Sequence, residues 1–102
     1  MIRVSIIYPN EPGKRFDWDY YLNNHKAAVN KKLGNIGLVR METDRGIGTV
    51  QPGAPAPFLA IGYMYFDCLE DLQTCLPHAG ELMSDLPNFT DIQPQIQISE
   101  VL

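Results

Sequence analysis

The residue best suited to proton transfer stands at position 25, in a stretch whose pattern predicts a helix. Trp18, Leu22, His25, Val29 and Leu33 recur every three or four residues, which is the spacing of one amphipathic helix face. His25 is therefore expected to face the core. An imidazole that titrates near neutral pH can act as a general acid or base. The alternative is a core histidine hydrogen-bonded to a backbone carbonyl or a tyrosine.

Two tyrosines are placed to meet this histidine. Tyr21 precedes His25 by four residues, so the two side chains are neighbours on a helix surface. Tyr8 ends the first predicted strand and could meet Tyr21 beneath the helix. Their hydroxyls would orient a substrate carbonyl or phenol, or tune the imidazole; the alternative for each is packing, with the ring buried and the hydroxyl reaching the surface. His25, Tyr21 and Tyr8 are the candidate catalytic residues.

Trp18, Met64 and His78 are the candidate substrate-binding residues. Trp18 and Met64 would form walls of a pocket between helix and sheet, or simply part of the core. His78 and Glu81 are three residues apart and could join His25 in a metal site. The chain has only two histidines and no His-Glu-x-x-His pattern, so a solvated helix start explains His78 better. The glycine-rich loop is not followed by a helix and cannot cradle a phosphate in the dinucleotide manner. We therefore expect neither metal nor cofactor.

The elements that must position these residues follow the order βαββαβ. Asp17 is a suitable N-cap for the first helix, and Gly34 is expected to end it in the left-handed conformation. Pro77 should kink or split the second helix. The predicted elements are strands over 2–9, 36–43, 58–66 and 92–101, helices over 17–33 and 68–86, and a loop over 46–57 that is mobile or covers a pocket.

This order predicts a single α+β domain over residues 1–102 with a ferredoxin-like fold. Two right-handed βαβ units give a four-stranded antiparallel sheet with both helices on one face. The strand over 58–66 is apolar on both of its faces, whereas a solvated sheet face should alternate with polar residues. A second copy packed on the open face would account for this pattern, so we expect a homodimer.

Composition and charge exclude several classes of function. All eight basic residues and five of the twelve acidic ones lie in residues 1–45, and residues 46–102 carry the other seven acidic residues. This acidic second half argues against a nucleic-acid partner. No apolar run is long enough to cross a membrane, and a strand-like pattern at the N-terminus indicates no signal peptide. Cys68 and Cys75 lie two helical turns apart, too far for a disulfide. Reduced thiols fit a cytoplasmic protein.

Three separated motifs resemble those of the EthD family. Residues 17–26, DWDYYLNNHK, are similar to its first-helix signature, in which a Tyr-Tyr pair precedes a His. Residues 82–94, LMSDLPNFTDIQP, are similar to its closing motif, and residues 52–58, PGAPAPF, to the loop before its central strand. The sequence departs from the family after His25, where Ala27 and Ala28 stand in place of a frequent Pro-Leu pair. The resemblance covers essentially the whole chain.

The resemblance implies a dimeric α+β barrel and a loose link to oxidative degradation, since the founding member accompanies a monooxygenase system for ether breakdown. The wider superfamily includes metal-free monooxygenases, haem-degrading enzymes and polyketide cyclases. We expect a small, mostly apolar or aromatic organic substrate and a cofactor-free oxidoreductase, monooxygenase-type or cyclase-type reaction. The alternative is a non-enzymatic ligand-binding or accessory partner of a larger oxidative system. A third option, haem degradation, would use His78 as an iron ligand. A cavity beside His25 would favour the enzyme, and a filled core the partner.

Overall fold

One four-stranded sheet forms the centre of the protein. The computed structural model describes all of residues 1–102. The strands are β1 (Ile2–Pro9), β2 (Leu38–Arg45), β3 (Phe58–Phe66) and β4 (Gln95–Glu100), in the spatial order β2-β3-β1-β4, and each neighbouring pair is antiparallel. The strand order and the connections confirm the predicted ferredoxin-like α+β fold.

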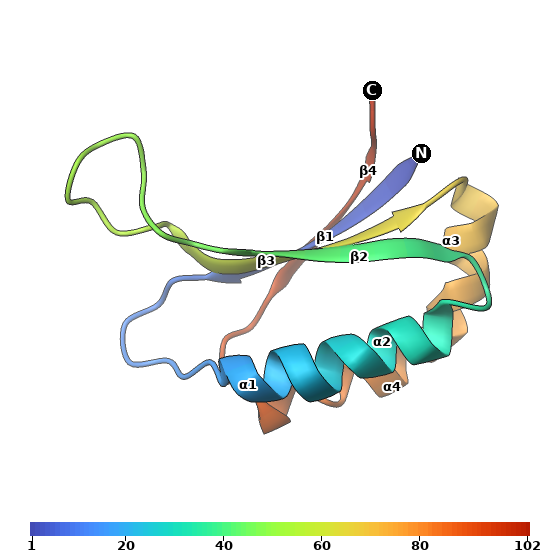
Figure 1. Ribbon diagram of the computed structural model, residues 1–102, viewed down its shortest axis with the longest axis horizontal. Coiled ribbons are helices and arrows are strands. Elements are labelled where there is room, and N and C mark those ends of the chain that lie inside the picture. Colours follow the sequence, from blue (N-terminus) through green and yellow to red (C-terminus); the bar gives the residue numbers. More distant parts are fainter.

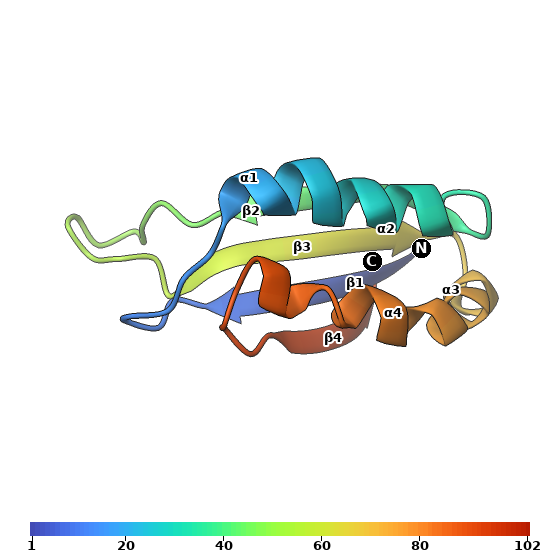
Figure 2. The same cartoon turned by 90° about the horizontal axis from the view of Figure 1, so that it is seen from below.

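Two helical segments cover one face of this sheet and leave the other face open (Figure 1 and Figure 2). The first runs without a break through α1 (Trp18–Tyr20), a π-helical turn (Tyr21–His25) and α2 (Lys26–Leu33). The second consists of α3 (Leu69–Cys75), a 3₁₀ turn (Leu76–His78) and α4 (Ala79–Met83), and a further 3₁₀ turn (Leu86–Asn88) precedes β4. None of these helices combines the length and the apolar character that spanning a membrane requires.

The first helix confirms its predicted start and corrects two details. The Asp17 carboxylate accepts the backbone N–H of Tyr20 at 3.1 Å, as an N-cap does. Gly34 is right-handed, with a φ of −60°, and the first residue after this helix with a positive φ is Gly37, at +132°. Leu22, predicted to face inward, is 46% exposed.

The π-helical turn explains why Tyr21 takes the inward position predicted for Leu22. A π-helix closes its hydrogen bonds over five residues, so each turn contains more residues than an α-helical turn. A spacing of four then keeps side chains on one face. Tyr21, His25, Val29 and Leu33 are accordingly the buried residues of this segment.

Pro77 splits the second helical segment, as predicted. It occupies the 3₁₀ turn between α3 and α4, because its ring cannot continue an α-helical hydrogen-bond ladder. Leu72 and Cys75 of α3 are buried, whereas Leu69 and Leu76 are about half exposed. Both cysteines are free, and Cys68 is exposed while Cys75 is buried.

Two apolar clusters lie between the sheet and the helices. One contains Phe66 and Cys75 together with Val4, Val29, Leu33, Leu38 and Leu72. The other is mostly aromatic and contains Tyr8, Tyr21, Ala60, Phe89 and Ile92. The loop over 46–57 projects beyond the sheet (Figure 1). None of its residues lines the cavity between the helices and the sheet, so the loop does not cover that cavity.

The open face of the sheet is apolar along β3 and mixed elsewhere. Side chains alternate between the two faces of a strand, which places Leu59, Ile61, Tyr63 and Tyr65 of β3 on this face. The register aligns Ile61 with Ile7 of β1. The outer strands add polar and charged groups, and the Arg40 guanidinium of β2 lies 3.9 Å from the centroid of the Tyr65 ring.

Candidate functional site

A cavity of about 170 Å³ lies between the helices and the sheet. Four of the six candidate residues line it: Tyr8, Tyr21, His25 and Met64. The other lining residues are aliphatic or aromatic apart from Cys75, and they come from β1 (Val4, Ile6), β2 (Met41), β3 (Phe66), β4 (Ile96, Ile98), α2 (Val29, Leu33) and the second helical segment (Leu72, Cys75, Leu76, Ala79, Leu82, Met83). Ile96, Ile98 and Leu76 are each about half exposed, so the cavity reaches the surface between β4 and the second helical segment.

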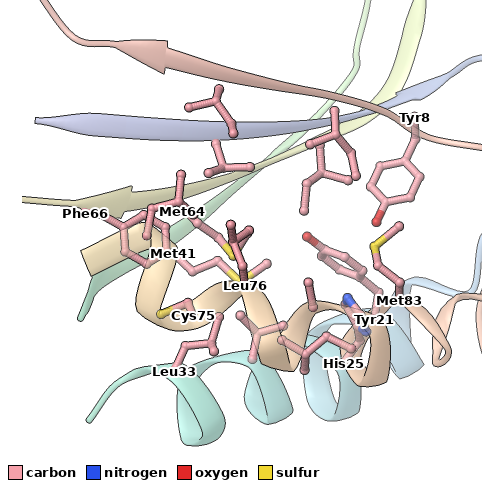
Figure 3. A pocket seen from close by; sticks show the side chains of 18 residues that line it. Tyr8, Tyr21, His25, Leu33, Met41, Met64, Phe66, Cys75, Leu76 and Met83 are labelled. Atoms are coloured by element: carbon pink, nitrogen blue, oxygen red, sulfur yellow. The ribbon is translucent and has the colours of Figure 1, made fainter. Parts of the chain in front are cut away.

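The polar groups of the cavity are gathered at one end. Figure 3 shows Tyr8 descending from the sheet toward Tyr21 and His25 on the first helix, while Phe66, Met64 and Met41 lie at the opposite end. A pocket with an apolar body and a few convergent polar groups is the usual form of a small-molecule site.

His25 is held by a carboxylate that the sequence analysis did not single out. Its Nδ1 lies 3.0 Å from Oδ2 of Asp85, on the segment between α4 and the last 3₁₀ turn. The Oδ1 atom of Asp85 accepts the Tyr20 hydroxyl at 2.7 Å and the Asn88 amide at 2.8 Å. Partial burial opposes ionisation of Asp85, but the hydrogen bonds from Tyr20, Asn88 and His25 outweigh it and lower its pKa. The carboxylate is therefore ionised at neutral pH and fixes the orientation of the imidazole.

Tyr21 is anchored to the sheet. Its hydroxyl lies 3.0 Å from the Thr43 hydroxyl on β2, and its ring is 5.7 Å from that of His25, centroid to centroid. Burial raises the pKa of Tyr21, and the hydrogen bond with Thr43 partly opposes the shift. Tyr21 is thus a neutral, rigid wall beside the imidazole.

Tyr8 presents a free hydroxyl to the cavity. The residue is 1% exposed and lines the cavity, and Figure 3 shows its hydroxyl pointing away from the sheet toward Tyr21 and Met83. The Nε of Arg3 is the only fully enclosed side-chain nitrogen or oxygen without a partner, so the Tyr8 oxygen is not both sealed off and unpaired, and the space beside this residue is the cavity. Burial, and secondarily the nearby Tyr21, raise the pKa of Tyr8. This phenol stays protonated and can donate a hydrogen bond.

Phe89 packs behind the polar residues of the cavity without lining it. Its side chain is fully buried, and its ring centroid lies 4.7 Å from that of His25, 5.4 Å from that of Tyr21 and 6.2 Å from that of Tyr8. The three polar residues are therefore packed around one aromatic ring, which restricts their rotamers.

Trp18 and His78, the other two candidate residues, do not line this cavity. Trp18 packs behind Tyr21, at 5.9 Å between ring centroids, and against Phe16 at 4.6 Å. His78 belongs to the 3₁₀ turn, in which residues three apart share a face; Leu76 and Ala79 take the inward face there. No group of three His, Cys, Asp or Glu side chains comes close enough to hold a metal, so His25, His78 and Glu81 do not form the site considered from the sequence.

Gly62 on β3 leaves room for the anchored Tyr21 hydroxyl. A Cβ at this position would lie 3.1 Å from that oxygen, so Gly62→Ala should displace it and break the bond to Thr43, at a cost of about 1 kcal/mol. In a Tyr21→Phe background the same change should be neutral or stabilising, because alanine orders a strand better than glycine. Urea unfolding of the four proteins measures this coupling. If Gly62→Ala changed the free energy of unfolding equally in both backgrounds, the side chain at position 62 and the Tyr21 hydroxyl would be independent.

Comparisons with known proteins bear on the family and the fold of the chain. The EthD domain model matches residues 13–93. The chain is 34% identical to an EthD-like protein from Ralstonia eutropha, covering 99% of this chain and 91% of that one with a TM-score of 0.88. It is 23% identical to an EthD family protein from Bacillus halodurans, covering 100% and 99% of the two chains with a TM-score of 0.74.

More distant structures share the fold alone. A protein from Mesorhizobium loti described as having a ferredoxin-like fold is 12% identical, covers 99% of this chain and 96% of its own, and has a TM-score of 0.57. No curated protein matches the chain. The match of the domain model over most of the chain and the identity to the Ralstonia protein lead to one conclusion: this chain belongs to the EthD family.

Proposed function

We propose that the cavity binds a small, mostly apolar or aromatic organic molecule and that His25 acts on it as a general acid or base. The observation that carries this proposal is the position of His25 at the wall of an apolar cavity, with its Nδ1 held by Asp85. The same observation favours an enzyme over the accessory role, which predicts a filled interface.

Cofactor-free oxidation and cyclisation both begin with removal of a proton from the substrate. This is the step that His25 can perform, and the resulting anion is the species that reacts with dioxygen or closes a ring. Tyr8 supports this assignment, because a protonated hydroxyl aimed into the cavity can stabilise the negative charge that develops. We therefore propose an oxidoreductase of the monooxygenase type or a cyclase.

We further propose that the chain forms a homodimer through the open face of its sheet and works in the cytoplasm. Both helical segments cover the other face, so Leu59, Ile61 and Tyr63 have no layer of this chain above them. An apolar strip flanked by mixed charges suits a two-fold, self-complementary interface. Free cysteines support a reducing compartment.

The cavity can be tested with one matched pair of variants. Ala79 lines the cavity, so Ala79→Leu should fill part of it and weaken binding of naphthalene or indole about tenfold or more. Ala27, exposed on the first helix, provides the control Ala27→Leu, which should bind as the unmodified protein does. Ligand-observed NMR titration measures both. If neither aromatic compound binds the unmodified protein, the proposed function is wrong.

A further inference from the structure

We propose that the polar end of the cavity selects a molecule with a weakly acidic hydroxyl, a phenol or an enol, and that Asp85 positions His25 to take its proton. This inference rests on the proposed function and names the substrate class of the same site. It follows from two atoms that can still form a hydrogen bond, Nε2 of His25 and the hydroxyl oxygen of Tyr8.

The contact with Asp85 determines which nitrogen of His25 carries the proton. Asp85 is ionised and has only acceptor atoms, so the Nδ1 atom of His25 that lies 3.0 Å away must carry the proton and donate it. In the neutral imidazole the other nitrogen, Nε2, is then a hydrogen-bond acceptor. It has no partner in the protein and is not sealed off, since only Arg3 Nε is both enclosed and unpaired. Because His25 lines the cavity, Nε2 is the acceptor available to a ligand.

The Tyr8 hydroxyl is the hydrogen-bond donor available to a ligand. The Tyr21 hydroxyl is engaged with Thr43, whereas the Tyr8 hydroxyl has no partner and opens onto the cavity. Figure 3 shows Tyr8 and His25 at the same end of the cavity, on opposite walls. The site thus offers one acceptor and one donor to a single ligand group.

A hydroxyl satisfies both groups, because it can donate to His25 Nε2 while it accepts from Tyr8. A ketone or an ether can only accept, and would leave Nε2 unpaired in an apolar cavity. Buried polar groups left without a partner make such sites discriminate strongly against analogues that lack the hydroxyl. An alkyl alcohol would fit this pattern too, but it is too weak an acid to transfer its proton to an imidazole.

Once a phenol is bound in this way, it can transfer its proton to His25. The O–H bond of the phenol breaks, its proton forms a new N–H bond at Nε2, and the phenolate oxygen keeps the electron pair and accepts the Tyr8 hydrogen bond. The imidazolium that results lies against the Asp85 carboxylate, which stabilises it. The titratable groups facing this site are Tyr8 from the sheet, Tyr21 from the first helix, Cys75 from α3, and Asp85 with its partner Tyr20. Lys32 and Glu81 share the outer groove with Asp85 but pair with each other, so Asp85 is the charged group in direct contact with His25.

Asp85 also connects the buried site with the surface. It lines an outer polar groove together with Tyr20, Lys32, Glu81 and Asn88, whereas His25 lines the inner cavity. The dyad therefore spans the helical layer, with its charged member at the solvent side and its basic nitrogen at the ligand side.

The test uses 4-nitrophenol, whose phenolate absorbs visible light, and 4-nitroanisole, which has the same shape with a methyl group on the oxygen. At a pH at which the free phenol is mostly un-ionised, the unmodified protein should bind it about tenfold or more tightly than the anisole and produce the phenolate band. Asp85→Asn should lose both the band and the preference, while Asp85→Glu should recover part of them. Asp19→Asn, an exposed aspartate on the same helical layer, should behave as the unmodified protein.

His25→Gln gives a second, independent readout. Its amide can still donate to Asp85 but cannot take a proton, so the band should disappear, and circular dichroism checks that the variant is folded. Persistence of the band in Asp85→Asn would overturn the role of Asp85. Equal binding of both probes without a band would overturn the phenol selectivity and leave the proposed function standing. If neither probe displaces naphthalene, and naphthalene itself does not bind, the proposed function fails as well.

Discussion

Replacing Phe89 by alanine should lower the free energy of unfolding by about 3–5 kcal/mol. The Phe89 side chain has no solvent exposure, and its ring contacts those of His25, Tyr8, Tyr21 and Phe16. Alanine would remove the apolar surface and leave an opening that these rings cannot fill without changing rotamers. The loss of stability should fall near the upper end of this range. The two helical segments and the sheet are held in place by other contacts, so they cannot move together to close the new cavity.

Chemical denaturation followed by circular dichroism measures this loss. Phe58→Ala is the matched control, because Phe58 begins β3 and is 39% exposed; its replacement should cost about 1 kcal/mol. At a denaturant concentration where it is still folded, Phe89→Ala should also lose affinity for aromatic ligands, since His25 and Tyr21 lose the ring that orients them. Similar losses for the two variants would mean that the aromatic cluster is not the main support of the site.

The strands and helices were predictable where hydrophobic periodicity and turn residues agree. β3 begins at Phe58 and ends at Phe66 as predicted, because proline precedes it and a continuous apolar run fills it. β4 begins at Gln95 rather than at residue 92. Ile92 is instead buried in the aromatic cluster, and Pro94, which has no backbone N–H, stands directly before the strand. Local sequence does not encode such tertiary packing.

The inner residues of the site were predictable in part. Tyr8, Tyr21 and His25 could be grouped, because helix spacing and the end of the first strand bring them to one region. The burial of Tyr21 in place of Leu22 could not be predicted, since it depends on a π-helical turn that no residue pattern marks. Asp85 was missed because it stands 60 residues from His25 in the chain and lies in a turn, where an aspartate ordinarily serves the local backbone.

Ile61→Lys should convert the proposed homodimer into a monomer. Ile61 lies on the open sheet face between Ile7 of β1 and Asp44 of β2. In the isolated chain the ammonium can reach water and lies beside Asp44, so the fold should tolerate the change. In a face-to-face dimer the same ammonium would be buried against the partner's apolar strip. Burial of an unpaired charge should weaken association about a hundredfold or more.

Sedimentation equilibrium at micromolar concentration separates these states, and circular dichroism checks that the variant is folded. Leu69→Lys is the matched control: Leu69 is also apolar and about half exposed, but it begins α3 on the helical layer, so its replacement should leave the dimer intact. If Leu69→Lys dissociates the protein and Ile61→Lys does not, the subunits meet through their helices and the open sheet face is solvated. Since the cavity lies on the helix side of the sheet, a folded Ile61→Lys monomer should still bind naphthalene, which separates assembly of the dimer from formation of the site.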